Sequence, residues 1–381
     1  MAASLRASSS PLRSRLLSSP AAWSPWRLLL SSSVHSDAAH QTETLAFHEI
    51  QLSPEKPPTA TAFVLHGLLG SGRNWRTFSR TLASQLRDRS PADEWKMVLV
   101  DLRNHGSSAR IKGLSPPHDM SSAAKDLADL VKARGWTWPD VVVGHSMGGK
   151  VALDFTESCS RGDYGESAAL PKQVHRCSVY ILIYIGICSV DLENPTVTYE
   201  KLWVLDSVPG EVKIDNSDGE VERVLETLAS LPSSLPSRKF LMLCLFAIRW
   251  VVDHMVSLGF SKSLSDWIGS NLKKDNEHVT WAFDLQAATD MFNSYRDRSY
   301  WGLLENPPKG LEISIVQAEL SDRWHPEDVQ RLKALSRRGS KPDAGKVSLH
   351  VLPNSGHWVH VDNPKGLLEI MAPNFLSTVQ N

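Results

Sequence analysis

Cysteine is scarce in this chain, with four residues among 381. The four thiols form no C-x-x-C pair and no cluster with histidine at the spacing of a zinc site. The pattern therefore indicates free thiols in a reducing compartment, and it predicts no metal site. The four residues are Cys159, Cys177, Cys188 and Cys244.

An excess of charge of either sign is also missing. The chain contains 41 Lys and Arg against 42 Asp and Glu, for a formal net charge of -1 and a pI near 6.9. No run of like charges forms a basic or acidic tail, so we expect no nucleic-acid partner. The apolar runs WRLLL and residues 179–187 are too short to cross a bilayer, so no stable membrane span is expected.

The first 36 residues lack Asp, Glu and Lys altogether, while they carry four arginines and many serines. Arginine-rich, acid-free composition is typical of an organellar transit peptide, which we expect to be disordered and to occupy residues 1–40. A disordered tail without a targeting role is the alternative. Removal of residues 1–36 takes away four positive charges and leaves a net charge of about -5. The arginines are Arg6, Arg13, Arg15 and Arg27.

From residue 45 to residue 381 the chain alternates strand-like and helix-like patterns. TLAFHEIQL alternates apolar and polar residues and indicates an antiparallel edge strand, whereas the other runs are continuously apolar, as strands buried on both faces are. This order predicts an α/β fold, a mostly parallel central sheet flanked by helices, with a helical insertion at about residues 210–300. The apolar runs are residues 61–67, 95–101, 140–145, 202–206, 311–319 and 347–353.

The run VVVGHSMGGKVAL, residues 141–153, is a buried strand that leads into a serine and then a helix. A serine on a tight strand-to-helix turn requires small residues two positions before and after it, and here these are Gly144 and Gly148. The motif predicts a nucleophile elbow with Ser146 exposed at the carboxyl edge of the sheet. The helix that begins near Met147 directs N–H groups towards developing negative charge.

Two further stretches complete the requirements of acyl transfer. In VLHGLLGSGRNW the strand ends at His66-Gly67, so the N–H of Leu68 is expected to form an oxyanion hole with that of Met147. In VLPNSGHWVH, His357 follows the last strand and is the expected general base. His360 completes an i, i+3 pair, but no third ligand lies nearby in sequence, so a metal is not expected.

These motifs together resemble the α/β-hydrolase superfamily, namely HGLLGSGRNW, DLRNHGSS, GHSMGGK, VLDSVP, WAFDL and SGHWVHVDNP. More narrowly, they are similar to alpha/beta-hydrolase domain-containing protein 11 and its bacterial esterase relatives, and the resemblance covers residue 45 to the end. It implies an α/β-hydrolase fold with a helical lid inserted after the sixth strand, a serine esterase activity with no cofactor, and Ser146 and His357 in the catalytic roles. For animal members it implies mitochondria, which agrees with the arginine-rich leader. The chloroplast is the alternative organelle for such a leader.

The acid of the triad is open at this point. In many α/β-hydrolases the acid follows the seventh strand, where VQAELSDRW offers Asp322; in the subgroup that this sequence resembles it follows the sixth, where LWVLDSVP offers Asp206. We favour Asp206 on the subgroup pattern. Asp101 and Arg103 in DLRNHGSS are expected to brace a loop.

The expected activity is hydrolysis of carboxylic ester or thioester bonds of a small or lipophilic acyl substrate, through a Ser-His-Asp triad and an acyl-enzyme. A small-molecule receptor whose lid controls partner binding is the alternative, because fold and triad alone do not exclude it. A lid-dependent acyltransferase and a carbon–carbon hydrolase are distinguished only by substrate.

One stretch fits neither the fold nor the site. Residues 174–201, VHRCSVYILIYIGICSVDLENPTVTYEK, join a helix to a strand, where such folds use a few residues. We expect an atypical insertion, although the stretch could itself be the sixth strand, with Asp191 as the acid. Residues 241–251, LMLCLFAIRWV, look similarly foreign within the lid.

Overall fold

The structure is a computed structural model of the 381-residue chain. It describes residues 44–165, 201–212, 219–232, 234–236, 242–275, 278–338 and 344–375. The compact unit runs from Thr42 to Asn381. The expected transit peptide, the possible acid Asp191 and all but the last residue of the 174–201 insertion lie outside the described residues.

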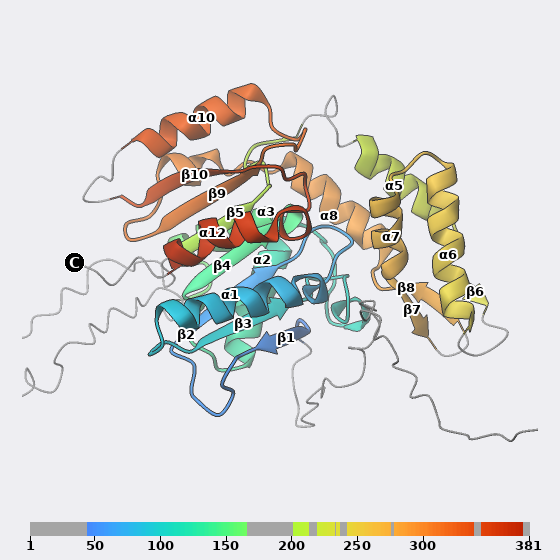
Figure 1. Cartoon of the computed structure of the whole chain (residues 1–381), viewed down its shortest axis with the longest axis horizontal. Coiled ribbons are helices and arrows are strands. Elements are labelled where there is room, and N and C mark those ends of the chain that lie inside the picture. The colour runs from blue at the N-terminus through green and yellow to red at the C-terminus, as the bar shows by residue number, and fades with distance from the viewer. Residues whose placement is uncertain are drawn as a thin grey trace, which may run out of the picture. The chain divides into compact units, whose positions relative to one another are not determined.

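A seven-stranded sheet forms the centre of the unit, with the strand order β1-β3-β2-β4-β5-β9-β10 (Figure 1). β1 pairs with β3 in antiparallel orientation and all other neighbours are parallel, which confirms the predicted α/β fold and its antiparallel edge. The strands are β1 Phe47–Ile50, β2 Ala60–Leu65, β3 Trp95–Val100, β4 Val141–His145, β5 Lys201–Leu205, β9 Glu312–Ala318 and β10 Lys346–Leu352.

Helices cover both faces of this sheet, because successive side chains of a strand point to opposite faces. In β5, Leu202 and Val204 pack in the cluster of α2, α3 and α10, whereas Trp203 and Leu205 pack in that of α1 and α12. Buried residues on both sides explain why the central strands are continuously apolar. The helices are α1 Arg76–Arg89, α2 Met120–Ala133, α3 Met147–Arg161, α10 Pro326–Arg337 and α12 Pro364–Phe375.

Short helices lie in the connections between these elements. They are η1 Gly72–Trp75, η2 Ser108–Arg110, α9 Trp301–Glu305 and α11 Val359–Asp362. η1 leads into α1, and α11 follows the loop that holds His357. Both therefore lie close to the carboxyl ends of the parallel strands.

The predicted insertion follows β5, and we call its described residues between 219 and 297 the lid. Its helices are accompanied by a three-stranded antiparallel sheet of order β6-β8-β7, which was not predicted. The reason lies in β8, where Val279 and Trp281 are buried and His278 is exposed, the period of a half-buried strand. The elements are α5 Gly219–Ser230, β6 Ser234–Pro236, α6 Met242–Ser257, α7 Lys262–Ser270, β7 Leu272–Asp275, β8 His278–Trp281 and α8 Leu285–Asp297.

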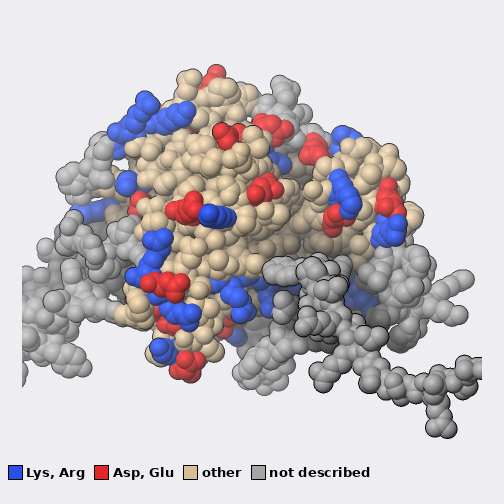
Figure 2. All heavy atoms as spheres, viewed as in Figure 1, with Lys and Arg blue, Asp and Glu red and all other residues tan. Residues whose placement is uncertain are grey.

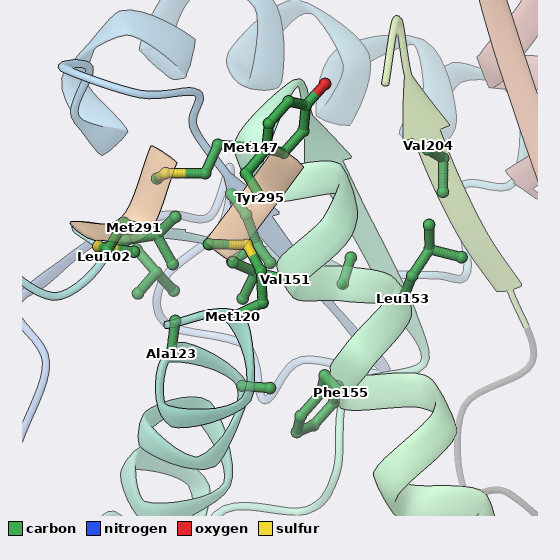
Figure 3. Packing of buried hydrophobic residues seen from close by; sticks show 14 of the residues in the cluster. Leu102, Met120, Ala123, Met147, Val151, Leu153, Phe155, Val204, Met291 and Tyr295 are labelled. Atoms are coloured by element: carbon green, nitrogen blue, oxygen red, sulfur yellow. The ribbon is translucent and has the colours of Figure 1, made fainter. Parts of the chain in front are cut away.

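The lid is joined to the main unit by an apolar core. Figure 3 shows Met120 and Ala123 of α2, Val151 of α3, and Met291 and Tyr295 of α8 among the packed side chains of one cluster. The stretch at residues 241–251 that looked foreign lies largely in α6, where Ala247 and Val251 are buried. α8 therefore contributes to the core as well as to the lid.

The strand next to the nucleophile strand is β5, since β4 pairs with it directly from Val141↔Lys201 to His145↔Leu205. LWVLD therefore forms the strand beside the nucleophile strand, but it is the fifth of the described strands in chain order, whereas the resemblance counted it as the sixth. The expected insertion at residues 174–201 overlaps the strand by one residue, because Lys201 belongs to β5 and is buried.

Charged side chains of both signs are interspersed over the face shown in Figure 2. Among the described residues, no helix is long and apolar enough to traverse a lipid bilayer. The expectation that nucleic acid is not a partner stays a prediction.

Candidate active site

Ser146 lies at the turn between β4 and α3 with φ 52° and ψ -122°. A positive φ is unfavourable for a residue with a Cβ atom, and such strain is found at functional sites. The backbone N–H of Ser146 donates to the Leu205 carbonyl at 3.0 Å, which ties the strained turn to β5. A nucleophile elbow holds its serine on a strained strand-to-helix turn of this kind.

The glycines around Ser146 are required by close backbone approaches. A Cβ atom on Gly144 would lie 2.2 Å from the Gly148 carbonyl oxygen, and one on Gly148 would lie 2.5 Å from the His66 carbonyl oxygen. A third glycine, Gly149, has no room because a Cβ atom there would lie 2.6 Å from that of Ser207. The sequence indicated the first two glycines, whereas only the packing against Ser207 explains the third.

His357 lies in the loop after β10, where its Nδ1 is 2.7 Å from Oδ2 of Asp206. The two residues are 151 positions apart in sequence. The Asp206 side chain is fully buried and that of His357 is 19% exposed, so one end of the pair faces the protein interior and the other faces the pocket. The carboxylate can therefore orient the imidazole and stabilise its cationic form.

The Asp206 carboxylate also accepts hydrogen bonds from the last residue of β9 and from the loop that follows this strand. The donors are Nε1 of Trp324 at 2.6 Å, Oγ of Ser321 at 2.8 Å and the N–H of Ala318 at 3.1 Å. Burial alone would raise the pKa of this carboxyl, but the hydrogen bond and charge of His357, with those of Trp324 and Ser321, outweigh it and lower the pKa. Asp206 is therefore ionised at neutral pH.

Asp322, the other acid that the sequence offered, lies between two of these donors in the chain. Its side chain is exposed and lines the pocket. The flanking Ser321 and Trp324 both bond to Asp206. The loop after β9 thus contributes donors to the acid that follows β5, and sequence reasoning missed these donors because they carry no charge.

The loop after β2 makes a tight turn beside Ser146. The N–H of Gly70 donates to the Gly67 carbonyl at 3.0 Å, and Leu69 between them has φ 57°. A left-handed residue at the third position is typical of a type II turn. Leu68 in this turn and Met147 at the start of α3 line the same pocket as Ser146.

His66 holds this turn against the loop that follows the neighbouring strand β3. Its Nδ1 is 2.8 Å from the Gly67 carbonyl oxygen, and its Nε2 accepts from the N–H of Leu102 at 3.0 Å. Since a carbonyl only accepts, Nδ1 carries the proton and the ring is neutral. Burial lowers the pKa of His66 to about 4, which keeps it neutral at pH 7.

Asp101 and Arg103 brace the loops around the site, as their motif predicted. The Asp101 carboxylate accepts from the N–H groups of Gly72 and Ser107, each at 2.8 Å. Arg103 donates to both oxygens of Asp126, at 2.7 and 2.9 Å, as a buried pair. Asp101 therefore connects the loop after β2 to the loop after β3.

His145, next to Ser146, supports the loop of His357. Its Nε2 donates to the His357 carbonyl oxygen at 2.8 Å, and the two rings are 4.7 Å apart. Burial and the neighbouring His357 lower the pKa of His145 well below its usual value. Sequence reasoning missed this residue, because only the fold shows what its ring contacts.

His360, which the sequence paired with His357 at i, i+3, stacks on Trp75 with ring centroids 4.0 Å apart. Among the described residues, no group of three or more His, Cys, Asp and Glu side chains could hold a metal ion. The ring of His360 therefore packs in the layer behind His145, at a centroid distance of 5.7 Å.

Ser146 and His357 line a pocket of about 170 Å³ between the main unit and the lid. Apolar side chains of the lid form much of its wall, while charged groups are few. The lid residues are Val221 and Val224 of α5, Leu264 and Trp267 of α7, and Phe292 and Tyr295 of α8; the charged ones are Glu220, Asp322 and Arg323.

The model of the alpha/beta hydrolase family matches residues 62–370. The chain is 32% identical over 306 residues to the sn-1-specific diacylglycerol lipase ABHD11 of Mus musculus, a match that covers 80% of this chain and 77% of that protein. It is 28% identical over 376 residues to the protein of the same name from Xenopus tropicalis, which covers 93% of each. The family match spans the positions of Ser146, Asp206 and His357.

Among solved structures, a marine microorganism esterase superposes with a TM-score of 0.60 at 19% sequence identity. The superposition covers 87% of this chain and 99% of the esterase. At that identity the likeness speaks for the fold, which agrees with the sheet order and the position of the strand-to-helix turn.

Proposed function

The chain belongs to the alpha/beta-hydrolase family, and from this premise we propose that it is a serine hydrolase that cleaves carboxylic ester or thioester bonds. The observation that carries the proposal is that Ser146, on its strained turn, lines one pocket with His357, whose Nδ1 is 2.7 Å from the buried Asp206. A serine nucleophile, a histidine base and a carboxylate that orients the histidine are the three members of a catalytic triad. Asp206, rather than Asp322, is the acid of the proposed triad.

The reaction proceeds in two steps in this proposal. Ser146 attacks the acyl carbonyl carbon while Nε2 of His357 takes the hydroxyl proton, and that proton then passes to the leaving alcohol or thiol. Water, deprotonated by the same histidine, attacks the acyl-enzyme. The bond to Ser146 breaks, the carboxylic acid is released, and His357 returns the proton to the serine oxygen. Asp206 stays ionised throughout and stabilises the imidazolium of His357, which the lowered pKa of the carboxyl supports.

The oxyanion is held by the N–H groups of Leu68 and Met147 in this proposal. Met147 is the first residue of α3, so its N–H lies at the positive end of a 15-residue helix. The turn of Leu68 is preorganised by His66 and by the Gly70–Gly67 hydrogen bond. Preorganised donors of this kind each contribute about 3–4 kcal/mol to transition-state stabilisation.

The substrate is a lipophilic acyl ester. The lid wall of the pocket is lined by apolar side chains, and the mouse and frog relatives are named as diacylglycerol lipases. Apolar pocket walls bind acyl chains through the area removed from water, at about 25 cal/mol per Å². The proposed reaction uses no cofactor or metal, because residues of the chain supply the nucleophile, the general base and the oxyanion donors.

The proposal is tested with Ser146→Ala. The variant is expected to lose hydrolysis of p-nitrophenyl esters and labelling by a fluorophosphonate probe, since both need the activated hydroxyl, while circular dichroism shows it folded. Undiminished labelling of the variant would exclude Ser146 as nucleophile. Negligible ester turnover by the wild type, together with ligand-dependent partner binding, would favour the receptor alternative.

We propose that the protein acts in mitochondria, with the chloroplast as the alternative. The support is the leader, which has four arginines and no acidic residue in residues 1–36.

A further inference from the structure

Lys150 is a fully buried lysine on the nucleophile helix, four residues after Ser146. Its Nζ donates to the carbonyl oxygens of Gly210 at 2.6 Å, Tyr295 at 2.5 Å and Arg298 at 2.8 Å. It also lies 4.5 Å from the centroid of the Tyr295 ring. Three acceptors match the three N–H bonds of an ammonium group, which explains how a lysine is accommodated away from water.

The three carbonyl groups belong to the two segments through which the chain enters and leaves the lid. Gly210 follows β5, and Tyr295 and Arg298 lie at the end of α8. The two crossing segments also bond to each other, because the N–H of Tyr300 donates to the Pro209 carbonyl at 2.8 Å and that of Val212 donates to the Arg296 carbonyl at 2.9 Å. The base of the lid therefore consists of two chain segments that are hydrogen-bonded to each other and packed against α3.

Asp154, one helical turn after Lys150, holds the same returning segment. Its Oδ2 accepts from the Tyr300 hydroxyl at 2.9 Å and from Ser121 Oγ at 3.0 Å. Arg298 in turn donates to Ser121 Oγ at 2.9 Å. Residues four apart share one face of a helix, so α3 presents a cation and an anion side by side to the lid base.

Tyr295 connects this base to the substrate pocket. Its carbonyl accepts from Lys150, its ring lies beside the ammonium group, and its side chain lines the pocket together with Phe292, one turn earlier on α8. Figure 3 shows Tyr295 among the packed side chains that include Met147 and Val151 of α3. The position of the α8 wall relative to Ser146 therefore depends on the contact with Lys150.

We propose that Lys150 is a positioning residue, which clamps both ends of the lid to the nucleophile helix and so sets the pocket wall formed by α8. In this role it determines how well the enzyme uses esters whose acyl chain reaches that wall. The inference rests on the proposed hydrolase function. Lys150 touches no reacting atom, since its three N–H bonds are directed to backbone carbonyls.

The test compares Lys150→Met with the wild type on p-nitrophenyl acetate and p-nitrophenyl octanoate. Met preserves the length of the side chain and removes its charge and donors. For octanoate we expect kcat/KM to fall by about tenfold or more, mainly through a raised KM, because a displaced wall weakens binding of the chain. For acetate, whose acyl group offers only a methyl, we expect a fall below about threefold.

A matched control is Lys125→Met on α2, whose lysine is exposed and pairs with Asp129. It is expected to leave both substrates unchanged. If Lys150 had a purely structural role, the substitution would lower kcat/KM for both esters by one common factor, the fraction of folded protein. That result would overturn the proposal. Equal kinetics of Lys150→Met and wild type would overturn it as well.

A milder variant covers the case in which Lys150→Met does not fold. Tyr300→Phe removes only the hydroxyl that bonds to Asp154, and it should raise KM for octanoate more than for acetate. An equal effect on both esters contradicts the clamp. If the wild type hydrolyses neither ester, the proposed function fails, and hydrogen exchange then tests the clamp alone. The amides of Val212 and Tyr300 should exchange about tenfold faster in Tyr300→Phe than in the wild type. Unchanged exchange rates would exclude the clamp.

Discussion

At the scale of single residues, Asp206 shows how a buried carboxylate is kept ionised and aimed. It has φ 42°, a strained value, and its oxygens accept from His357, Trp324 and Ser321. These bonds replace the water that burial removes, so the charge is tolerated. The same bonds lower the pKa of the carboxyl against the opposing effect of burial.

The first prediction separates the two possible acids. Asp206→Asn should lower kcat by about 10⁴-fold, since an amide cannot stabilise the imidazolium of His357. Asp322→Asn, in an exposed side chain of the same size, should change kcat by less than about threefold. Steady-state hydrolysis of p-nitrophenyl octanoate measures both. The reverse ranking would assign the acid to Asp322.

His105 illustrates a different consequence of burial. Its ring is fully buried, Nδ1 is 2.8 Å from the Arg103 carbonyl oxygen, and Nε2 has no hydrogen-bond partner within the described part of the chain. Protonation would place a donor where no acceptor is found. Burial, with the nearby His66, accordingly lowers the pKa of His105 to about 3.

The second prediction follows from this shift in pKa. In the unfolded chain the imidazole of residue 105 is protonated below about pH 6.5, whereas in the native protein it stays neutral down to about pH 3. The contribution of neutral His105 to the free energy of unfolding is therefore fully present above pH 6.5 and is lost as the pH falls from 6.5 to 3. Between about pH 5.5 and 4, His105→Phe should flatten the dependence of unfolding free energy on pH by about 1.4 kcal/mol per unit.

Urea titrations across that range measure the slope. The lost bond to Arg103 lowers stability by about 1 kcal/mol at every pH, which is an offset and leaves the slope unaffected. His278→Phe, an exposed histidine, serves as the control and should keep the wild-type slope. An unchanged slope in His105→Phe would contradict a neutral, buried His105.

At the scale of elements, the pairing of β4 with β5 positions the site. The two strands run parallel from Val141 to His145, so Ser146 and Asp206 leave neighbouring strands at the same edge. The N–H of Ser146 bonds to the last residue of β5, and the N–H of Asp206 bonds to Val316 of β9 at 2.8 Å. β5 therefore holds Ser146, the residue that follows β4, and β9 holds Asp206, the residue that follows β5.

The third prediction concerns the atypical insertion. Deletion of residues 174–200 keeps Lys201 in β5 and leaves eight residues, 166–173, between the described end of the α3 segment and that strand. Connections of this type need only a few residues. The shortened protein should be more soluble and at least as active on esters, because the deletion removes an apolar, aggregation-prone run and keeps every described residue that lines the pocket.

A longer deletion is the control for that experiment. Removal of residues 174–205 also takes away β5 and its pairing with both β4 and β9, so it should yield no soluble protein. If the deletion of 174–200 also fails to fold while the full chain is soluble and active, the segment belongs to the core.

At the scale of the whole molecule, strands from both ends of the chain build one sheet. The strands of residues 47–145 form one half, and those of residues 201–205 and 312–352 form the other. The lid is inserted between β5 and β9, so the chain leaves the sheet at β5, beside the nucleophile strand, and returns to it at the next strand, β9. Residues 1–43 precede the described unit.

The fourth prediction is that residues 1–40 act as a mitochondrial targeting sequence. Fused to a fluorescent protein, they should direct it to mitochondria in animal cells, because four arginines without a compensating acid in the first 36 residues give a cationic segment of the kind that import uses. Fluorescence microscopy with a mitochondrial dye reads the result. The same fusion with the four arginines changed to Gln should stay diffuse, and diffuse fluorescence of the unchanged leader would contradict the prediction.

The sequence by itself determined what depends on neighbours along the chain. The strain at Ser146 requires Gly144 and Gly148, and strands buried on both faces require continuous apolar runs, so the elbow, the parallel sheet and its antiparallel edge could be predicted. The position of His357 after the last strand followed from the same order of elements.

Only the tertiary structure decided what depends on contacts between distant segments. Asp206 and Asp322 both follow strands that end at one edge, so strand order alone cannot choose between them. The proposal of Asp206 as the acid rests on its contact with Nδ1 of His357 and on Trp324 and Ser321, which donate hydrogen bonds to it. Lys150 and His145 likewise gain their roles from backbone carbonyls 60 to 212 residues away, because a carbonyl is present at every residue and leaves no mark in the sequence.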